Sequence, residues 1–419
     1  MNNLLYLGLD FGTSGARAIV IDAQGHIAAQ AHCNYDIENW KSWLRALTWL
    51  CASLPRPIRQ RLAAIAIDGT SSTVLLCDET NVPVLPPLLY NDARAANAVA
   101  EIMAHGPPGH IATSATSSLA KLRYLLQYPE SKHARYFNDQ ASWLAAMLTG
   151  KPGISDYHNA LKLGYDVTTL SWPAWMTALG VAPWLPMVVP PGTRIDAVAP
   201  EVAAKLGFPL DCIVRAGTTD SIAAFIASGA HAPGTAVTSL GSTLVLKLLS
   251  TTRVEDACYG IYSHRFGKLW LAGGASNSGG AVLRQFFDDA ALALLSQQID
   301  PTQSSDLDYY PLPDSGERFP INDPRLAPRI TPRPEADAQF LHGLLEGVAR
   351  IEARGYELLA ALGATPVKQV FTAGGGAKNS AWTLIRERMV GVPVSTAAHH
   401  EAAYGTACLA KNGAALLAL

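Results

Sequence analysis

One hairpin pattern occurs twice and constrains this chain more than any other feature. Near the start, an apolar strand at 4–9 enters a turn rich in Gly, Thr and Ser at 10–15, and a second strand follows at 18–21. A similar pattern returns far along the chain, with strands at 235–240 and 244–248 around the turn 241–243. A repeated unit of this kind indicates an internal duplication of one α/β unit. We therefore expect an α/β fold with two similar lobes.

The rest of the chain alternates strand and helix patterns, with the strands expected from short apolar runs and the helices from apolar residues at i, i+3 and i+4. The expected strands cover 26–31, 63–67, 74–77, 212–216 and 367–371, and the expected helices cover 40–54, 94–105, 118–128, 140–148, 221–228, 340–362 and 380–390. Residues 229–234 resemble a hinge, and residues 301–335, with eight prolines, predict a long surface loop.

Composition excludes several classes of protein. The length of 419 residues suggests two or three domains at roughly 150 residues each. A hydrophobic content of 49% excludes a disordered chain. Lys and Arg number 32 against 34 Asp and Glu, so no basic excess is available to bind a nucleic-acid backbone. We expect no nucleic-acid partner.

The cysteine pattern and the apolar segments of the sequence predict the cellular compartment. Its six cysteines are scattered singly, with no C-x-x-C and no zinc-type Cys/His spacing, which favours reduced thiols. The N-terminus has no basic segment before its apolar run, and no stretch of 18 residues stays apolar. We expect a cytoplasmic protein with no membrane partner.

Three turns carry the strongest chemical signal: residues 10–17, 239–244 and 373–382 are all rich in small residues. Glycines let backbone N–H groups approach an anion, and a following helix N-terminus adds partial positive charge. One such turn alone is more often structural than functional. Three in one chain favour a nucleotide site between two lobes. None matches the P-loop or the dinucleotide G-x-G-x-x-G pattern.

Two acids and one hydroxyl cluster are candidate site residues. Asp220 follows an expected strand and precedes a helix, so it is either a helix N-cap or a general base for a substrate hydroxyl. Asp10 is either a turn residue or an acid that holds Mg²⁺. Ser71, Ser72 and Thr73 form either a polar turn or a site for a polyhydroxylated ligand.

At this point several segments resemble the FGGY family of carbohydrate kinases over nearly the whole chain. LGLDFGTSGARA resembles the family's first phosphate motif, AIDGTSST its sugar-contacting turn, and YNDARA the segment that follows. SDYHNA resembles T-D-x-S-N-A, and GTTDSIAA resembles the segment with the catalytic aspartate. SLGST, GERFP and AGGGAKNSAW resemble the second phosphate motif, G-E-R-x-P and the adenosine motif. All occur in the family's order.

The resemblance implies a two-lobed fold of the actin/Hsp70/hexokinase type, built on duplicated ribonuclease H-like units with a central cleft. Residues 1–228, with a C-terminal helix at 401–419 packing back on them, would form a sugar-binding lobe. Residues 229–400 would form a nucleotide-binding lobe. ATP and Mg²⁺ would be required, and a sugar would be the small-molecule partner of a monomer or homodimer.

The resemblance also implies roles for particular residues. Asp220 would be the catalytic base, and Asp10 and Asp220 would hold the metal. Ser71, Ser72, Asp220 and Ser221 would face the sugar. The nucleotide would be bound by Gly12, Thr13, Ser14, Gly241, Ser242, Thr243, Gly375, Gly376, Asn379 and Trp382, the last as a packing surface for the base.

The sugar turn departs from two subgroups of the family. Xylulokinases usually carry Met-His-Gly there and glycerol kinases Arg-Glu, whereas this chain has Ser71-Ser72-Thr73. That variant, with YNDARA, resembles the short pentulose kinases of cyanobacteria and plants, which implies D-ribulose as substrate. D-xylulose or another sugar or polyol is the alternative within the family. A nucleotide-dependent switch that hydrolyses ATP without a sugar is the alternative from another class.

Overall fold

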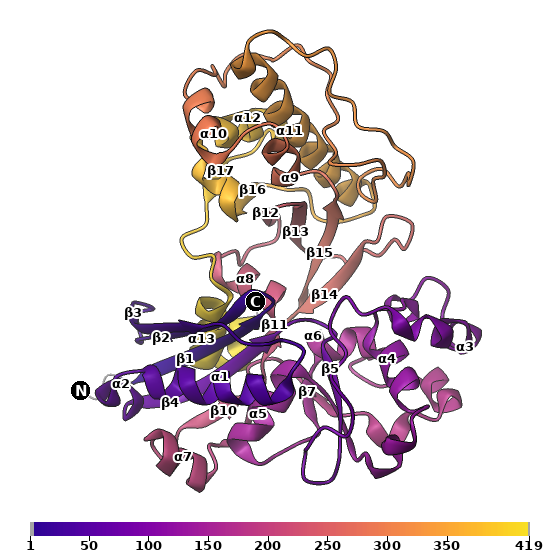
Figure 1. Ribbon diagram of the computed structural model, residues 1–419, viewed down its shortest axis with the longest axis vertical. Helices are drawn as coiled ribbons and strands as arrows, with labels where there is room; N and C mark the ends of the chain where they lie inside the picture. Colours follow the sequence, from indigo (N-terminus) through magenta and orange to yellow (C-terminus); the bar gives the residue numbers. More distant parts are fainter. Residues whose placement is uncertain (1–3, 418–419) are drawn as a thin grey trace. The chain divides into compact units, whose positions relative to one another are not determined.

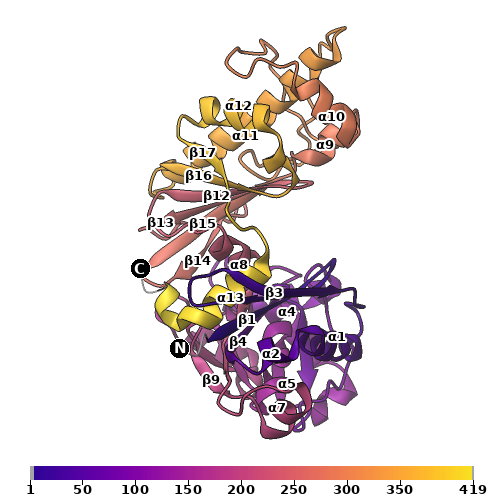
Figure 2. The same ribbon diagram turned by 90° about the vertical axis from the view of Figure 1, so that its left-hand side faces the viewer.

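The computed structural model describes residues 4–417, which divide into two compact units. The first unit comprises the chain up to Ala227 together with the segment from Glu401 onward, and the second comprises Ser228–His400 (Figures 1 and 2). The sequence places these boundaries at 228/229 and 400/401.

The first unit is built on a sheet with the strand order β3-β2-β1-β4-β10-β9, to which β11 adds by pairing with β4. β1 pairs antiparallel with β2 and parallel with β4, and β10 continues the parallel part of the sheet. The strands are β1 (Leu5–Gly12), β2 (Gly15–Ile21), β3 (Ile27–Cys33), β4 (Leu62–Gly69), β9 (Arg194–Ala197), β10 (Ile213–Arg215) and β11 (Thr218–Thr219).

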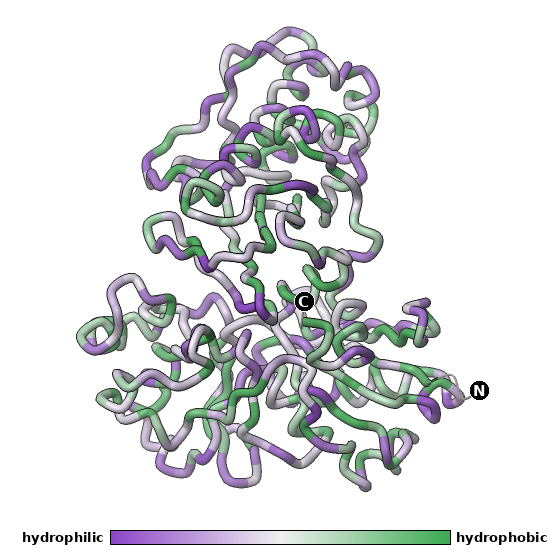
Figure 3. Tube along the Cα trace, turned by 180° about the vertical axis from the view of Figure 1, so that it is seen from behind, coloured by the Kyte–Doolittle hydropathy of each residue, from purple (hydrophilic) through white to green (hydrophobic). Residues whose placement is uncertain are grey.

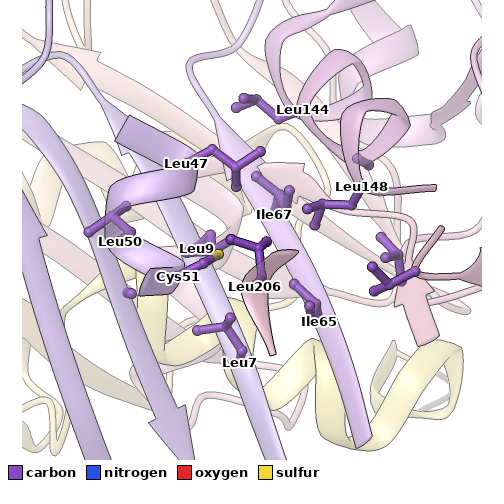
Figure 4. Packing of buried hydrophobic residues seen from close by; sticks show 14 of the residues in the cluster. Leu7, Leu9, Leu47, Leu50, Cys51, Ile65, Ile67, Leu144, Leu148 and Leu206 are labelled. Atoms are coloured by element: carbon purple, nitrogen blue, oxygen red, sulfur yellow. The ribbon is translucent and has the colours of Figure 1, made fainter. Parts of the chain in front are cut away.

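Helices cover both faces of this sheet. On one face, α1 (Trp40–Ser53), α5 (Gln140–Thr149) and α7 (Pro200–Leu206) pack on alternate residues of β1 and β4, and this packing forms the main core (Figure 4). On the other face, α13 (Ala402–Asn412) lies against β1, β2 and β4, and it also packs against α8 (Asp220–Ala227). Gly8 allows this approach, because a Cβ there would lie 2.1 Å from the carbonyl oxygen of Ala403.

A subsidiary region of the first unit carries two small sheets and its own hydrophobic cluster. The strand pairs are β5 (Val74–Cys77) with β6 (Tyr136–Asp139), and β7 (Ile154–Asp156) with β8 (Met187–Val189). The helices of this region are α3 (Val99–His105), α4 (Ser118–Leu125) and α6 (Tyr157–Ala160). Val74 and Leu76 of β5 pack with Leu119 and Leu122 of α4 in that cluster. The region therefore holds α4 beside the segment that precedes β5.

The second unit is built on a sheet of order β14-β15-β13-β12-β16-β17. Its strands are β12 (Thr235–Leu240), β13 (Leu244–Ser250), β14 (Tyr262–Phe266), β15 (Leu269–Ser276), β16 (Gln369–Ala373) and β17 (Val394–Thr396). The helices are α9 (Gly280–Arg284), α10 (Asp289–Ser296), α11 (Asp337–Ala361) and α12 (Ser380–Val390). The long helix α11 buries its apolar side in this unit's core.

The two sheets share one topology, as the repeated hairpins predict. In each, a hairpin is followed by a third antiparallel strand on one side and by two parallel strands on the other. Hydropathy follows the layers, because the apolar stretches run through the strands and the packed helices while polar positions gather in the outer loops (Figure 3). The duplicated α/β unit is therefore present in both halves of the chain.

Some predicted boundaries are wrong. Residues 10–12 are not a turn, because β1 continues through Gly12 in register with Gly15–Arg17 of β2. The predicted helix 94–105 starts as a 3₁₀ segment at Arg94–Ala98, and the helix predicted over 118–128 ends at Leu125. Residues 301–335 form a long connection with no helix or strand, as their prolines predict. Within the described chain, no helix is both long and apolar enough to cross a bilayer.

Candidate active site

Three carboxylates meet where neighbouring strands of the first sheet end. Asp10 on β1 and Asp68 on β4 are register partners in adjacent parallel strands. Thr218 of β11 is the register partner of Asp68, and the chain reaches Asp220 two residues later at the start of α8. The carboxyl ends of parallel strands share one edge of a sheet, so the topology itself brings these acids together.

Burial makes the ionisation of this cluster unusual. Burial, with a further contribution from the charge of Asp220, raises the pKa of Asp10 to about 6, although a hydrogen bond from Asp68 opposes the rise. Asp68 is fully buried, and burial together with the charge of Asp10 raises its pKa well above the usual range. The Thr406 hydroxyl on α13 donates to Asp68 Oδ2. Burial therefore favours the protonated form of Asp68.

Asp220 is half-buried and is the first residue of α8. Its Oδ1 accepts a hydrogen bond of 2.6 Å from the backbone N–H of Ser221, the next residue. The helix N-terminus favours the negative charge of this carboxylate. The position suits both a residue that stabilises the helix start and a carboxylate that accepts a proton.

Two side chains that the sequence did not single out link the first glycine-rich turn to the turn that follows β4. Thr13 and Ser14 form the exposed tip of the glycine-rich turn, and the Tyr35 hydroxyl donates to the Gly12 carbonyl over 2.8 Å. Gln140 Nε2 lies 3.3 Å from the Tyr35 hydroxyl, and Gln140 Oε1 accepts from both the N–H and the hydroxyl of Thr70, each over 3.1 Å. One hydrogen-bonded chain therefore holds both turns.

Two of the three residues in the hydroxyl cluster after β4, Ser72 and Thr73, use their hydroxyl groups in hydrogen bonds within the protein. Ser72 is buried with a φ of 65°, and its Oγ accepts a hydrogen bond of 3.2 Å from Ser118. Thr73 Oγ1 lies 2.5 Å from Thr70 Oγ1 and accepts from the Tyr90 N–H over 3.1 Å. Ser71 is only partly buried, so it is the serine of this pair that retains accessible surface.

Two further motifs support these turns. Asp156 of SDYHNA is buried and caps α6 through the backbone N–H groups of His158 and Asn159. His158 Nδ1 lies 2.7 Å from the hydroxyl of Thr218, two residues before Asp220. In YNDARA, Arg94 forms an ion pair with Asp92 at 2.8 Å, at the start of the 3₁₀ segment Arg94–Ala98.

The second unit contains a pocket of about 520 Å³ beside its own glycine-rich turns. Five of the predicted nucleotide-binding residues line it, namely Gly241, Gly375, Gly376, Asn379 and Trp382. Arg284 and Lys378 contribute two positive charges to the lining, and Asp289 contributes one negative charge. Ser242 and Thr243 are not among the residues that line this pocket.

Two of the lining residues also have structural duties. Asn379 caps α12 by accepting from the Trp382 N–H over 3.0 Å, and its Nδ2 donates to Ser296 Oγ over 2.8 Å. Trp382 is buried, and its Nε1 donates to the Leu345 carbonyl over 3.0 Å. A Cβ on Gly376 would lie 2.6 Å from Leu240 Cβ, so only glycine lets the two turns pack this closely.

Glu317 of GERFP is a buried carboxylate that accepts only from uncharged donors. It binds the Ser276 hydroxyl at 2.5 Å and the Tyr310 hydroxyl at 3.1 Å. It also binds the backbone N–H groups of Asn277 at 2.8 Å and Arg318 at 2.9 Å. The segment that it fixes also contacts the glycine-rich turn 241–243, since the Leu244 N–H donates to the Ser278 carbonyl over 2.7 Å.

Within residues 4–417, no three His, Cys, Asp or Glu side chains are arranged to hold a metal ion. Mg²⁺ seldom needs such a cage, because it is usually bound through one or two carboxylates, water and substrate phosphates. Asp10 and Asp220, which lie close enough for their charges to interact, fit that smaller donor set.

Comparison with known proteins agrees with this geometry. The N-terminal domain of the FGGY family of carbohydrate kinases matches residues 5–227, and the C-terminal domain matches residues 236–414. The chain therefore belongs to the FGGY family of carbohydrate kinases.

The curated relatives carry several substrate names. A xylulose kinase from Streptomyces coelicolor is 27% identical, with 93% of this chain and 84% of that protein covered. A glycerol kinase from Acidovorax sp. is 26% identical, with 93% and 86% covered. A xylulose kinase from Escherichia coli is 23% identical, with 90% and 83% covered.

Solved structures share the fold. A xylulose kinase from Rhodospirillum rubrum superposes with a TM-score of 0.86 at 22% identity, covering 99% of this chain and 92% of the other. A protein described as a xyloylose kinase from Brucella ovis gives 0.85 at 24% identity, covering 98% and 90%. The predicted two-domain α/β fold of the actin/hexokinase type is confirmed.

Proposed function

We propose that this carbohydrate kinase transfers the γ-phosphoryl group of ATP to the 5-hydroxyl of a pentulose, with D-ribulose as the preferred substrate. The observation that carries the proposal is the hydroxyl turn Ser71–Thr73 in the same hydrogen-bonded chain as the first glycine-rich turn, beside the Asp10–Asp220 pair. Polar side chains at a turn are suited to a polyhydroxylated ligand. The relatives named above act, by their names, on xylulose or glycerol, so D-xylulose is the nearest alternative.

In the proposed reaction, the sugar oxygen forms a bond to the γ-phosphorus while the bond from that phosphorus to the β–γ bridging oxygen breaks, and ADP leaves. Asp220 accepts the proton of the attacking hydroxyl, and its place at the start of α8 fixes the direction from which it does so. Mg²⁺, when bound, neutralises charge on the phosphate oxygens. Asp10 and Asp220 would hold it.

The backbone of each glycine-rich turn supplies fixed dipoles for the phosphate groups. The pocket of the second unit, with Gly241, Gly375 and Gly376 in its lining, suits the nucleotide, and Arg284 and Lys378 favour its negative charge. These groups are held before substrate arrives, because Gly376 packs directly against Leu240 and Asn379 caps α12. Catalysis by positioning requires such preorganisation.

The test is ADP release with Mg·ATP across a panel of D-ribulose, D-xylulose, L-ribulose, L-xylulose, glycerol and no sugar. We expect the highest kcat/KM with D-ribulose. Preference for another sugar would keep the phosphoryl transfer and overturn the interpretation of the Ser-Ser-Thr turn. ADP release that no sugar stimulates would favour a nucleotide switch, for which the hydroxyl turn has no purpose.

A further inference from the structure

Lys121 is the most unusual charged residue outside the acid cluster. It lies on α4 within the first unit and is fully buried, although lysine is almost never fully buried without a charged partner. Its ammonium group donates to the carbonyl oxygens of Ser72 at 2.8 Å, Leu89 at 2.6 Å and Tyr90 at 3.4 Å. Within the described chain, no carboxylate accepts a hydrogen bond from it.

These three carbonyls belong to the two segments that frame the proposed sugar site. Ser72 is the middle residue of the hydroxyl turn, and Leu89 and Tyr90 lead into YNDARA. The same face of α4 also holds the Ser72 side chain, because Ser118 stands three residues before Lys121 and donates to Ser72 Oγ over 3.2 Å. Both the main chain and the side chain of Ser72 are therefore fixed from α4.

Ser72 needs this support. Its φ of 65° lies in the left-handed region, which a residue other than glycine adopts only where its surroundings impose it. A neutral amine has two N–H donors and an ammonium has three, so three carbonyl acceptors favour the charged form. Burial acts in the opposite direction and lowers the pKa of Lys121 to about 7. The buried ammonium group of Lys121 thus lies directly behind the hydroxyl turn, where its three hydrogen bonds offset the cost of burial.

We propose that Lys121 is the positioning residue of the sugar site, which fixes the Ser71–Thr73 turn and the segment at Tyr90 in the geometry that recognises the substrate hydroxyls. This inference rests on the proposed function. Lys121 itself does not contact the sugar, because its ammonium is used by the three carbonyls and it has no exposed surface.

The test compares Lys121→Met with Lys132→Met, the same substitution at an exposed lysine eleven residues further on. Met retains the length of the side chain and removes the three donors. We expect Lys121→Met to lower kcat/KM for the sugar by about 10²-fold, the typical cost of misplacing a substrate through a remote residue. The KM for ATP should stay unchanged, and Lys132→Met should resemble the parent protein.

A purely structural role would lower the amount of active enzyme and affect both substrates alike. Equal losses toward sugar and ATP, or an unchanged kcat/KM for the sugar, would therefore overturn the proposal. Should Lys121→Met not fold, Ser118→Ala removes the second support of Ser72 without leaving buried carbonyls unpaired. We expect a smaller loss in the same direction, and an unchanged sugar KM in Ser118→Ala would contradict the proposal.

Hydrogen exchange separates failure of this inference from failure of the proposed function. The Thr73 N–H donates to the Thr70 carbonyl over 3.1 Å, and the Tyr90 N–H donates to Thr73 Oγ1 over 3.1 Å. In Lys121→Met both amides should exchange faster, while the second unit keeps its protection. This result needs no sugar. A parent protein that no sugar stimulates would refute the pentulose kinase, and unchanged exchange at Thr73 and Tyr90 would refute the role of Lys121.

Discussion

The two sheets share a core of five strands with the same order and directions, and they carry different chemistry at equivalent edges. In the first, the end of β1 carries Asp10 and its register partner on β4 is Asp68. In the second, the end of β12 carries Ser239 and its register partner on β16 is Ala373. The acids are therefore on one copy of the duplicated unit, while the other copy has small residues and glycine turns. The shared topology supplies positions, and the residues at these positions decide what each unit can bind.

The turns of the two units are also held by opposite charges. Lys121 stands behind the hydroxyl turn and donates only to carbonyl oxygens, whereas Glu317 stands behind the loop next to the phosphate turn and accepts only from N–H and O–H groups. Both charges are buried and satisfied mainly by uncharged groups. A loop that is fixed by a side chain in this way stays ordered without being part of a helix or a strand.

The largest effect is expected when a carboxylate is removed from the acid cluster of the first unit. Asp220→Asn should lower kcat by about 10²- to 10⁴-fold, because an amide cannot accept the proton of the attacking hydroxyl. The proposed nucleotide pocket lies in the second unit, so the affinity for ADP measured by calorimetry should not change. An Asp220→Asn variant with near-normal turnover would show that Asp220 is only a helix-start residue.

Replacing Glu317 tests whether the second unit depends on its buried charge as the first depends on Lys121. In Glu317→Met, the side chain keeps its length and loses both oxygens, so the backbone N–H groups of Asn277 and Arg318 lose their acceptor at about 1–3 kcal/mol each. We expect the KM for ATP to rise by about 10- to 10²-fold while the KM for the sugar stays unchanged.

The matched control is Glu335→Met, the same change at an exposed position of the same loop region. We expect opposite selectivity from the two buried positions. Lys121→Met should lower kcat/KM for the sugar, and the Glu317 variant should raise the KM for ATP. Equal effects of both variants on both substrates would mean that the two turns are not separately supported.

The sequence predicted the parts of this site that are encoded locally. The hairpins, the buried strands and the glycine-rich turns are runs of neighbouring residues, and the pocket in the second unit brings together Gly241, Gly375 and Gly376 as their motifs suggested. The motif at 373–382 did not reveal that Asn379 and Trp382 serve as a cap and as core.

The missing parts are single residues that act over long sequence separations. Tyr35 and Gln140 join the two turns of the first unit, and Thr406 binds Asp68 from a helix at the other end of the chain. No spacing rule connects such residues. The extension of β1 to Gly12 was missed for a similar reason, because pairing with β2 and β4 overrides the turn preference of its glycine.

A smaller effect is expected from a test of whether the second unit needs a glycine at position 376. Gly376→Ala would place a Cβ 2.6 Å from Leu240 Cβ and 3.0 Å from the Trp382 ring, so the turn must shift. We expect the KM for ATP to rise by about 10-fold, in line with an overpacking cost of 1–3 kcal/mol. Gly375→Ala is the comparison variant, since a Cβ there meets no protein atom within 4 Å, so the turn should keep its position and its thermal stability. Equal losses of thermal stability in both variants would remove the contact with Leu240 as the explanation.

The smallest expected effect concerns pH and the first unit alone. Asp10 has a pKa of about 6 in the folded protein against 3.8 in an exposed carboxyl, chiefly because it is buried. The folded state therefore binds more protons than the unfolded state between these values, so the contribution of Asp10 to stability falls as pH rises from about 4 to 6. Activity should change in the opposite direction, because in the proposed mechanism Asp10 would hold Mg²⁺ only as the ionised carboxylate.

We expect kcat/KM for the sugar to rise with pH, with an apparent pKa near 6. A higher Mg²⁺ concentration should lower this apparent pKa, because a cation favours the charged form of the carboxyl group. Thermal unfolding without Mg²⁺ should show the parent protein losing stability over the same pH range relative to Asp10→Asn, which has no carboxyl to ionise there. A parent protein that gains stability relative to Asp10→Asn as pH rises would mean that Asp10 is ionised throughout and that burial does not control it.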